Sequence, residues 1–154
     1  MKRNKKYNKE IPKETFMNGL RHIVLLILGI GILIAQEPPE EFQYEISTQS
    51  AFYYFNSVTI NGVGIESDDW VGAFNGDICV GARKWDTSLC GNGVCDVPVM
   101  GDDGGSETSG YIQVGDIPTF KIYDASEDSY YDAIPSENIP WEDNLYPTID
   151  ALNG

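Results

Sequence analysis

Short runs of apolar and β-branched residues alternate with clusters of polar turn residues through most of the chain. Runs of this kind, separated by Gly, Asn, Asp and Ser, are typical of strands in an antiparallel sandwich or barrel. After residue 35, no segment places its apolar residues at the spacing of about 3.6 that an amphipathic helix needs. We therefore expect an all-β domain, built as an antiparallel β-sandwich of immunoglobulin-like or jelly-roll-like type.

Two Asn-Gly pairs predict tight hairpins. Asn61-Gly62 separates residues 57–60 from 63–65, and Asn75-Gly76 separates residues 70–74 from 77–82. Asn and Gly readily adopt the two positive φ angles that such a turn requires. A third hairpin is expected around residues 124–128. Further strands are expected at residues 52–60, 97–100, 111–114, 119–123 and 130–133.

The N-terminal 35 residues have a different pattern. They contain seven of the ten Lys and Arg, followed by an uncharged apolar run over residues 23–35. That run is shorter than the roughly 20 residues of a membrane-spanning helix. A basic start, a short apolar core and a small final residue are typical of a secretory signal peptide. We expect cleavage after Ala35, with an uncleaved signal anchor as the alternative, and in both cases export of the remainder.

The exported part is expected to form one domain. Residues 36–41 are rich in Pro and Glu and read as a linker. Residues 42–133 are assigned to the β-sandwich, whose length is sufficient for its own hydrophobic core. Residues 134–154 contain three prolines and are expected to be an extended tail, which packs on the domain or leads to a further module.

Removing the leader changes the charge balance sharply. Residues 36–154 keep three basic residues, Arg83, Lys84 and Lys121, against 22 Asp and Glu, which gives a formal charge of −19. Such a surface repels nucleic-acid phosphates and anionic lipids. We expect no nucleic-acid partner, and no membrane contact beyond the leader.

The three cysteines, Cys79, Cys90 and Cys95, are too few for a fold held together mainly by disulfides. One pair is still expected in an oxidising compartment. Cys90 and Cys95 flank a flexible Gly-Asn-Gly-Val loop, which favours a disulfide between them. A bond between Cys79 and Cys90 is the alternative. If Cys79 is unpaired, we expect it to be buried as a small apolar residue.

Two strings resemble a known module. Residues 68–82 read Asp-Asp-Trp-Val-Gly-Ala-Phe-Asn-Gly-Asp-Ile-Cys-Val-Gly-Ala, and residues 115–124 read Gly-Asp-Ile-Pro-Thr-Phe-Lys-Ile-Tyr-Asp. In this order and at this distance they resemble a β-sandwich module that recurs in secreted, multi-domain surface proteins of bacteria, especially marine ones. The resemblance covers about residues 52–132. It implies an adhesive, glycan-related or carrier role and carries no catalytic residue over.

Histidine chemistry is not expected in the domain, because the one histidine of the chain, His22, lies in the leader. Without His, the domain lacks the usual general base and the Ser-His and Cys-His nucleophile pairs. Paired carboxylates could cleave glycosides, but with 22 acidic residues chance pairs are certain. We expect a protein that is not an enzyme and that requires no cofactor.

Calcium is the one metal that the pattern favours. Adjacent Asp residues in loops supply several oxygen ligands at short reach. The best candidates are Asp68 with Asp69 and Asp102 with Asp103, ahead of Asp116, Asp124 and Asp128. Asp and Gly are also ordinary turn residues, which explains most of these positions without a metal.

Aromatic side chains give a second candidate site. Sugar rings stack on exposed aromatic faces, and acidic neighbours accept their hydroxyl groups. Trp85 beside Asp86 is the best candidate for an exposed platform, with Trp70 second because it opens a predicted core strand. The alternative for any one ring is that it fills the core.

The sequence therefore predicts a noncatalytic, exported β-sandwich with a structural or adhesive role, secreted or held at the cell surface. The second hypothesis is a carbohydrate-binding module assisted by calcium. The expected partners are other extracellular modules or surface glycans. Exposed, coplanar aromatic rings would favour glycan binding, and burial of Trp70 and Trp85 would favour the structural role.

Overall fold

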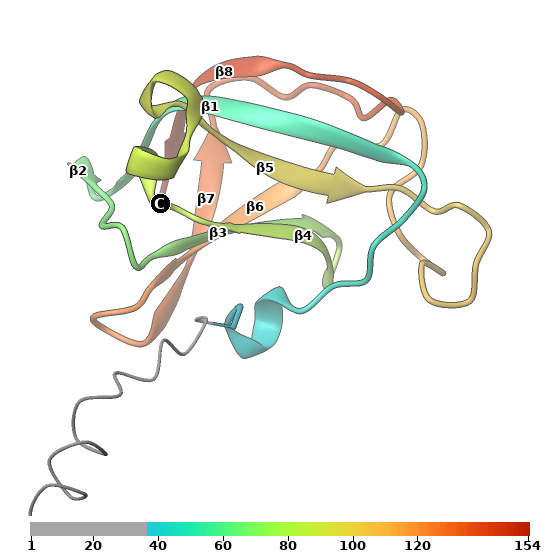
Figure 1. The fold of residues 1–154 in the computed structure, drawn as a ribbon, viewed down its shortest axis with the longest axis horizontal. Coiled ribbons are helices and arrows are strands. Elements are labelled where there is room, and N and C mark those ends of the chain that lie inside the picture. Colours follow the sequence, from blue (N-terminus) through green and yellow to red (C-terminus); the bar gives the residue numbers. More distant parts are fainter. Residues whose placement is uncertain (1–36) are drawn as a thin grey trace, which may run out of the picture. The chain divides into compact units, whose positions relative to one another are not determined.

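Residues 37–154 are described by the structure, a computed structural model, and they fold mainly into β-strands (Figure 1). The expected all-β class is confirmed. The predicted signal peptide (residues 1–35), its cleavage site and Gln36 lie outside the described residues. No helix within residues 37–154 is long and apolar enough to cross a membrane.

Eight strands and three short 3-10 helices make up the described part. The strands are β1 (Ser50–Ile60), β2 (Val63–Gly64), β3 (Trp70–Asn75), β4 (Ile78–Lys84), β5 (Cys95–Met100), β6 (Thr119–Asp124), β7 (Ser129–Pro135) and β8 (Thr148–Asn153). The 3-10 helices are η1 (Glu40–Phe42), η2 (Thr87–Leu89) and η3 (Gly91–Gly93).

The strands form a mixed sheet that curls into a half-barrel, with a sandwich-like arrangement. Their order is β2-β1-β8-β7-β6-β3-β4, and β5 pairs with β1 off this path. Figure 1 shows β1, β5 and β8 on one side of the domain and β3 and β4 on the other. The curl brings β4 against β5, where the carbonyl group of Pro98 lies directly over Gly81.

The expectation of a purely antiparallel sheet is wrong in one place. β8 runs parallel to β1, from Tyr54 opposite Thr148 to Thr59 opposite Asn153. The last strand comes from the segment expected to be a tail, and it contributes Ile149 and Leu152 to the core. β8 runs antiparallel to its other neighbour, β7.

All three expected hairpins are present. Asn61 and Gly62 both have positive φ, 51° and 79°, in the turn between β1 and β2. The turn between β3 and β4 is displaced by one residue, because Asn75 still pairs with Ile78 and Gly76 takes the first central position with φ 60°. Gly alone supplies the positive φ of this kind of turn. The third turn joins β6 to β7.

The strand expected at residues 111–114 does not form. Ile112 makes a single parallel bridge with Gly101, and its side chain is fully buried. The apolar pair Tyr111 and Ile112 therefore fills the core from a loop. A short apolar pattern indicated burial correctly but not strand pairing.

The main core lies inside the curl of the sheet. Burial alternates along β1 through Ala51, Tyr53 and Phe55 and then shifts by one residue to Val58. The same shift occurs in the parallel partner between Ile149 and Leu152. Trp141 is fully buried and its Nε1 donates a hydrogen bond to the carbonyl group of Val99 at 3.0 Å.

A second cluster covers the outer face of β3, so that β3 is buried on both faces. Phe42 of η1 is fully buried and lies against Gly72, with edge-on contacts to Phe74 and Tyr130. Next to it, Lys121 forms an ion pair with Glu41 at 3.0 Å. The end of the expected linker is thus packed on the sheet.

A disulfide joins Cys90 and Cys95, which confirms the first of the two expected pairings. Cys79 is a free, buried thiol, which excludes the alternative pairing with Cys90. Burial raises the pKa of Cys79 to about 11. The thiol is therefore protonated at neutral pH and packs as an apolar residue.

Candidate functional site

Trp85 is buried, which makes the expectation of an exposed aromatic platform at this residue wrong. Its side chain is 5% exposed and packs against Phe55, with ring centroids 6.4 Å apart. The backbone N–H of Trp85 donates to the carbonyl group of Asp69 at 2.8 Å. This bond continues the β3–β4 pairing by one residue, and the indole ring lies in the main core.

Trp70 and Asp86, the other two expected ligand-binding residues, line one cavity of about 360 Å³. Trp70 is 7% exposed, and its Nε1 is buried without a hydrogen bond within residues 37–154. Asp86 caps η2, because its Oδ1 accepts hydrogen bonds from the backbone N–H and the hydroxyl group of Ser88. The remaining lining residues are Ala82, Arg83, Lys84, Leu89 and Cys90.

Two of the three basic residues of the domain, Arg83 and Lys84, therefore meet at this cavity. The Arg83 guanidinium group is held by Asp96 of β5, through Nη2 to Oδ2 at 2.6 Å and Nε to the carbonyl oxygen at 3.0 Å. This pair also fastens β4 to β5. The cavity is a concave surface with polar groups of both signs.

Asp69 was expected to be a calcium ligand, and the structure gives it a different set of partners. Its side chain is 3% exposed. Oδ2 accepts the N–H of Glu66 at 2.7 Å, and Oδ1 accepts the N–H of Ala125 at 2.9 Å. A buried carboxylate needs such donors, and here they join the loop before β3 to the β6–β7 turn. Asp68, its neighbour in sequence, is exposed.

Asp103 organises the loop after β5. Its carboxylate accepts hydrogen bonds from the hydroxyl group of Thr108, the N–H and hydroxyl group of Thr48, and the N–H of Gly105. These donors, the Thr108 hydroxyl group first, hold the pKa of Asp103 well below its usual value. Asp102 accepts the N–H of Gly104 at 2.9 Å.

The two acidic pairs do not converge on a metal site. Asp69 contacts the β6–β7 turn, whereas Asp103 contacts Thr48 and the loop over residues 104–108. Among residues 37–154, no three His, Cys, Asp or Glu side chains are grouped so that they could hold a metal ion. Calcium binding stays a prediction.

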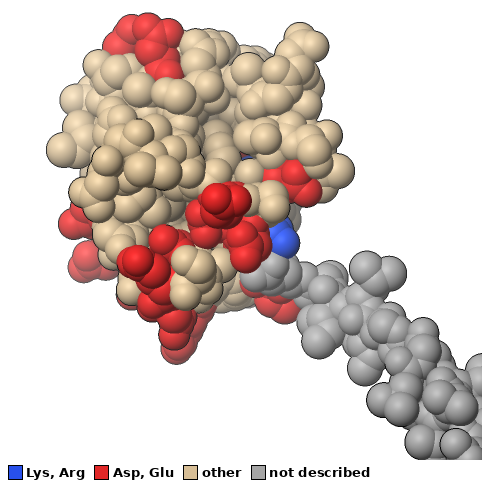
Figure 2. Space-filling view, turned by 90° about the vertical axis from the view of Figure 1, so that its left-hand side faces the viewer, with Lys and Arg blue, Asp and Glu red and all other residues tan. Residues whose placement is uncertain are grey.

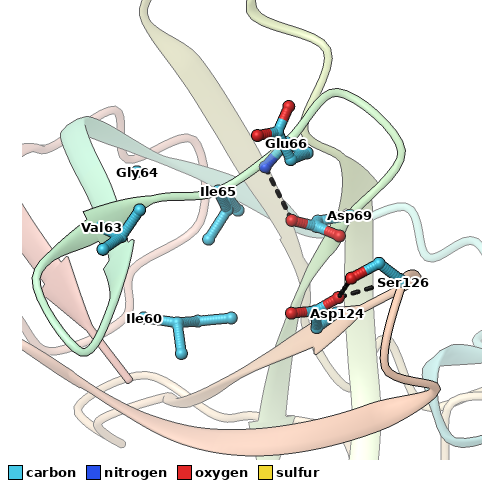
Figure 3. A pocket seen from close by; sticks show the side chains of 8 residues that line it. All are labelled: Ile60, Val63, Gly64, Ile65, Glu66, Asp69, Asp124 and Ser126. Carbon is cyan, nitrogen blue, oxygen red and sulfur yellow. Dashed lines mark hydrogen bonds between the residues drawn. The ribbon is translucent and has the colours of Figure 1, made fainter.

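A second cavity, of about 190 Å³, opens between the β1–β2 hairpin and the β6–β7 turn. Figure 3 shows its two unlike walls: Ile60, Val63 and Ile65 on one side, and Asp69 and Asp124 on the other. Gly64, Glu66 and Ser126 complete the lining. No local pattern indicates this cavity, because Asp124 and Ser126 lie more than 50 residues after the other lining residues.

Asp124 is the carboxylate of this cavity with the most local donors. Its Oδ1 accepts the N–H and hydroxyl group of Ser126, both at 2.8 Å, and the N–H of Glu127 at 3.1 Å. These bonds, the Ser126 hydroxyl group first, lower the pKa of Asp124. The side chain therefore stays ionised at neutral pH.

Figure 2 shows that acidic side chains recur over one face of the domain, where basic ones are scarce.

One aromatic pair lies at the surface outside both cavities. The rings of Phe52 and Tyr146 are parallel within 3°, with centroids 5.8 Å apart, and Tyr146 is 59% exposed. Each ring covers part of one face of the other.

In comparisons with known proteins, no protein-family model, no curated protein and no solved structure matches this chain.

Proposed function

We propose that this protein is an exported, noncatalytic β-module with an adhesive or structural role at the cell surface or in a secreted protein. The observation that carries the proposal is that side chains expected to bind a ligand or a metal are engaged inside the domain. Trp70 and Trp85 are buried, and Asp69 and Asp103 each accept several hydrogen bonds from the domain itself. These residues stabilise loops that a partner protein would contact.

The strongly negative charge supports an adhesive role toward proteins. With a formal charge of −19 over residues 36–154, long-range attraction favours basic partners and repels other acidic surfaces. The expected partners are other extracellular protein modules.

Adhesion can be measured with beads coated with residues 36–154, under flow over surfaces that carry either proteins or polysaccharides. We expect retention on protein surfaces that weakens as salt is added, because exposed charges are screened. Beads coated with the thermally unfolded domain are the control. The proposal would be contradicted if the beads were retained on polysaccharide surfaces but not on protein surfaces, and if the same polysaccharide in solution abolished that retention.

Carbohydrate binding is the second candidate, favoured by the 360 Å³ cavity. Trp70 and Asp86 both line it. Within residues 37–154 the Trp70 Nε1 has no hydrogen-bond acceptor, and a sugar oxygen could become its acceptor after a small movement. Residues 36–154 would be titrated with soluble polysaccharides in calcium while tryptophan fluorescence is followed. A saturable change that Trp70→Phe removes supports this candidate, and a flat response over the panel eliminates it.

A further inference from the structure

We propose that the 190 Å³ cavity between the β1–β2 hairpin and the β6–β7 turn receives a Lys or Arg side chain from a partner protein. This proposal rests on the adhesive form of the proposed function and names the chemistry of its partner. The cavity is smaller than the roughly 300–1,000 Å³ of drug-sized pockets. Its size and its two unlike walls suit one long side chain rather than a larger ligand.

The acidic wall fits the cationic head of that side chain. Among the described residues, all three hydrogen bonds to Asp124 reach Oδ1, so Oδ2 keeps its lone pairs for an incoming donor. Asp69 is fixed through both oxygens by the N–H groups of Glu66 and Ala125. Two carboxylates held by backbone donors form a preorganised negative wall, which needs little rearrangement to bind a cation.

The apolar wall fits the aliphatic stem. Lys and Arg pack their methylene groups on apolar surface while the charged end meets polar partners. Ile60, Val63 and Ile65 provide such a surface opposite the carboxylates (Figure 3), and Val63 is 71% exposed. The two-residue strand β2 ends the strand path, so this wall is open to a partner.

A bare metal ion fits this cavity less well. Calcium takes about six to eight oxygen ligands at roughly 2.3–2.6 Å. Here one whole wall is hydrocarbon, and within residues 37–154 no set of acidic side chains is grouped for a metal. A purely apolar group would in turn desolvate Oδ2 of Asp124 without offering it a hydrogen-bond donor, which is unfavourable. An amphipathic cation satisfies both walls.

The test uses ¹⁵N-labelled residues 36–154, because the structure shows that residues 37–154 carry the complete sheet and both hydrophobic clusters. The probes are capped tripeptides with a central lysine, arginine, norleucine or glutamate. The amides of Glu66 and Ala125 donate directly to Asp69 and are the reporters. We expect saturable shifts with lysine and arginine that diminish at high salt, and none with norleucine or glutamate.

Two variants make the result specific. Asp124→Asn keeps an oxygen for Ser126 but removes the charge, and should weaken lysine and arginine binding roughly tenfold, as for one charge-assisted hydrogen bond. Asp77→Asn makes the same charge change in the exposed β3–β4 turn and should leave binding unchanged. Val63→Ser should weaken binding of the lysine peptide through the stem.

Three results would overturn the inference: no reporter shift with lysine or arginine, equal shifts with norleucine, or an equal loss in both Asp variants. Saturable shifts with calcium chloride but not with the peptides would also overturn it and assign the cavity to a metal. The proposed adhesive function would survive any of these results, because bead retention on proteins is measured independently.

Discussion

The carbonyl group of Pro98 in β5 occupies the position that a Cβ atom on Gly81 in β4 would take. The two strands are not joined by backbone pairing, since β4 pairs with β3 and β5 pairs with β1. Close backbone contact at a glycine, together with the Arg83–Asp96 ion pair, therefore closes the curl of the sheet.

Gly81→Ala should consequently destabilise the domain by about 1–3 kcal/mol or more, because the methyl group meets backbone that cannot move without opening the curl. Urea denaturation of both forms gives the difference in unfolding free energy. Gly64→Ala is the matched control, since a Cβ at Gly64 would have no atom of residues 37–154 within 4 Å. Equal stability of the two alanine variants would show that β4 and β5 are not held in this contact.

Phe42 anchors the N-terminal segment on the outer face of β3. Phe42→Ala removes a fully buried ring and exposes Phe74 and Gly72, so we expect a loss of about 3–5 kcal/mol. Thermal and urea unfolding measure it. Ile46→Ala, at a side chain that is 73% exposed, should change the unfolding free energy by less than about 0.5 kcal/mol. A small effect of Phe42→Ala would mean that the segment is not docked.

The Cys90–Cys95 disulfide closes a very short loop, with a sequence separation of 5. Chain entropy for a loop this short predicts a contribution of about 2 kcal/mol. Replacing both cysteines by serine should lower the unfolding free energy by this amount, as should reduction with dithiothreitol. If reduction leaves the doubly substituted protein unchanged but destabilises the natural one, the disulfide accounts for the effect and the free Cys79 does not.

Acid should weaken the loop that Asp103 organises. In the folded protein the pKa of Asp103 lies below its usual value of 3.8, because the ionised carboxylate accepts hydrogen bonds from Thr108, Thr48 and Gly105. At a pH above the pKa of Asp103 in the unfolded chain, the ionised carboxylate stabilises the folded state. This contribution is lost as the pH falls through the pKa of Asp103 in the folded protein. Unfolding temperatures of the natural protein and of Asp103→Asn should therefore converge below about pH 3.8. Parallel curves would contradict the assignment.

The sequence by itself determined the local features. Adjacent residues encode a hairpin, because the φ angles of Asn61 and Gly62 are set by the residues themselves. The all-β class likewise follows from strand-length runs and turn residues. The short flexible loop favoured the pairing of Cys90 with Cys95 over the pairing of Cys79 with Cys90.

The tertiary structure decided which face each residue presents and which distant residues meet. Residues 148–153 read as part of a tail, yet the apolar Ile149 and Leu152 gain most by entering the core beside β1. Trp85 reads as an exposed platform, yet its ring is buried against Phe55 of β1. Asp69 and Asp124 share a cavity wall only because β3 and β6 are neighbours. Burial and proximity depend on the register of strands far apart in sequence, and no local pattern specifies that register.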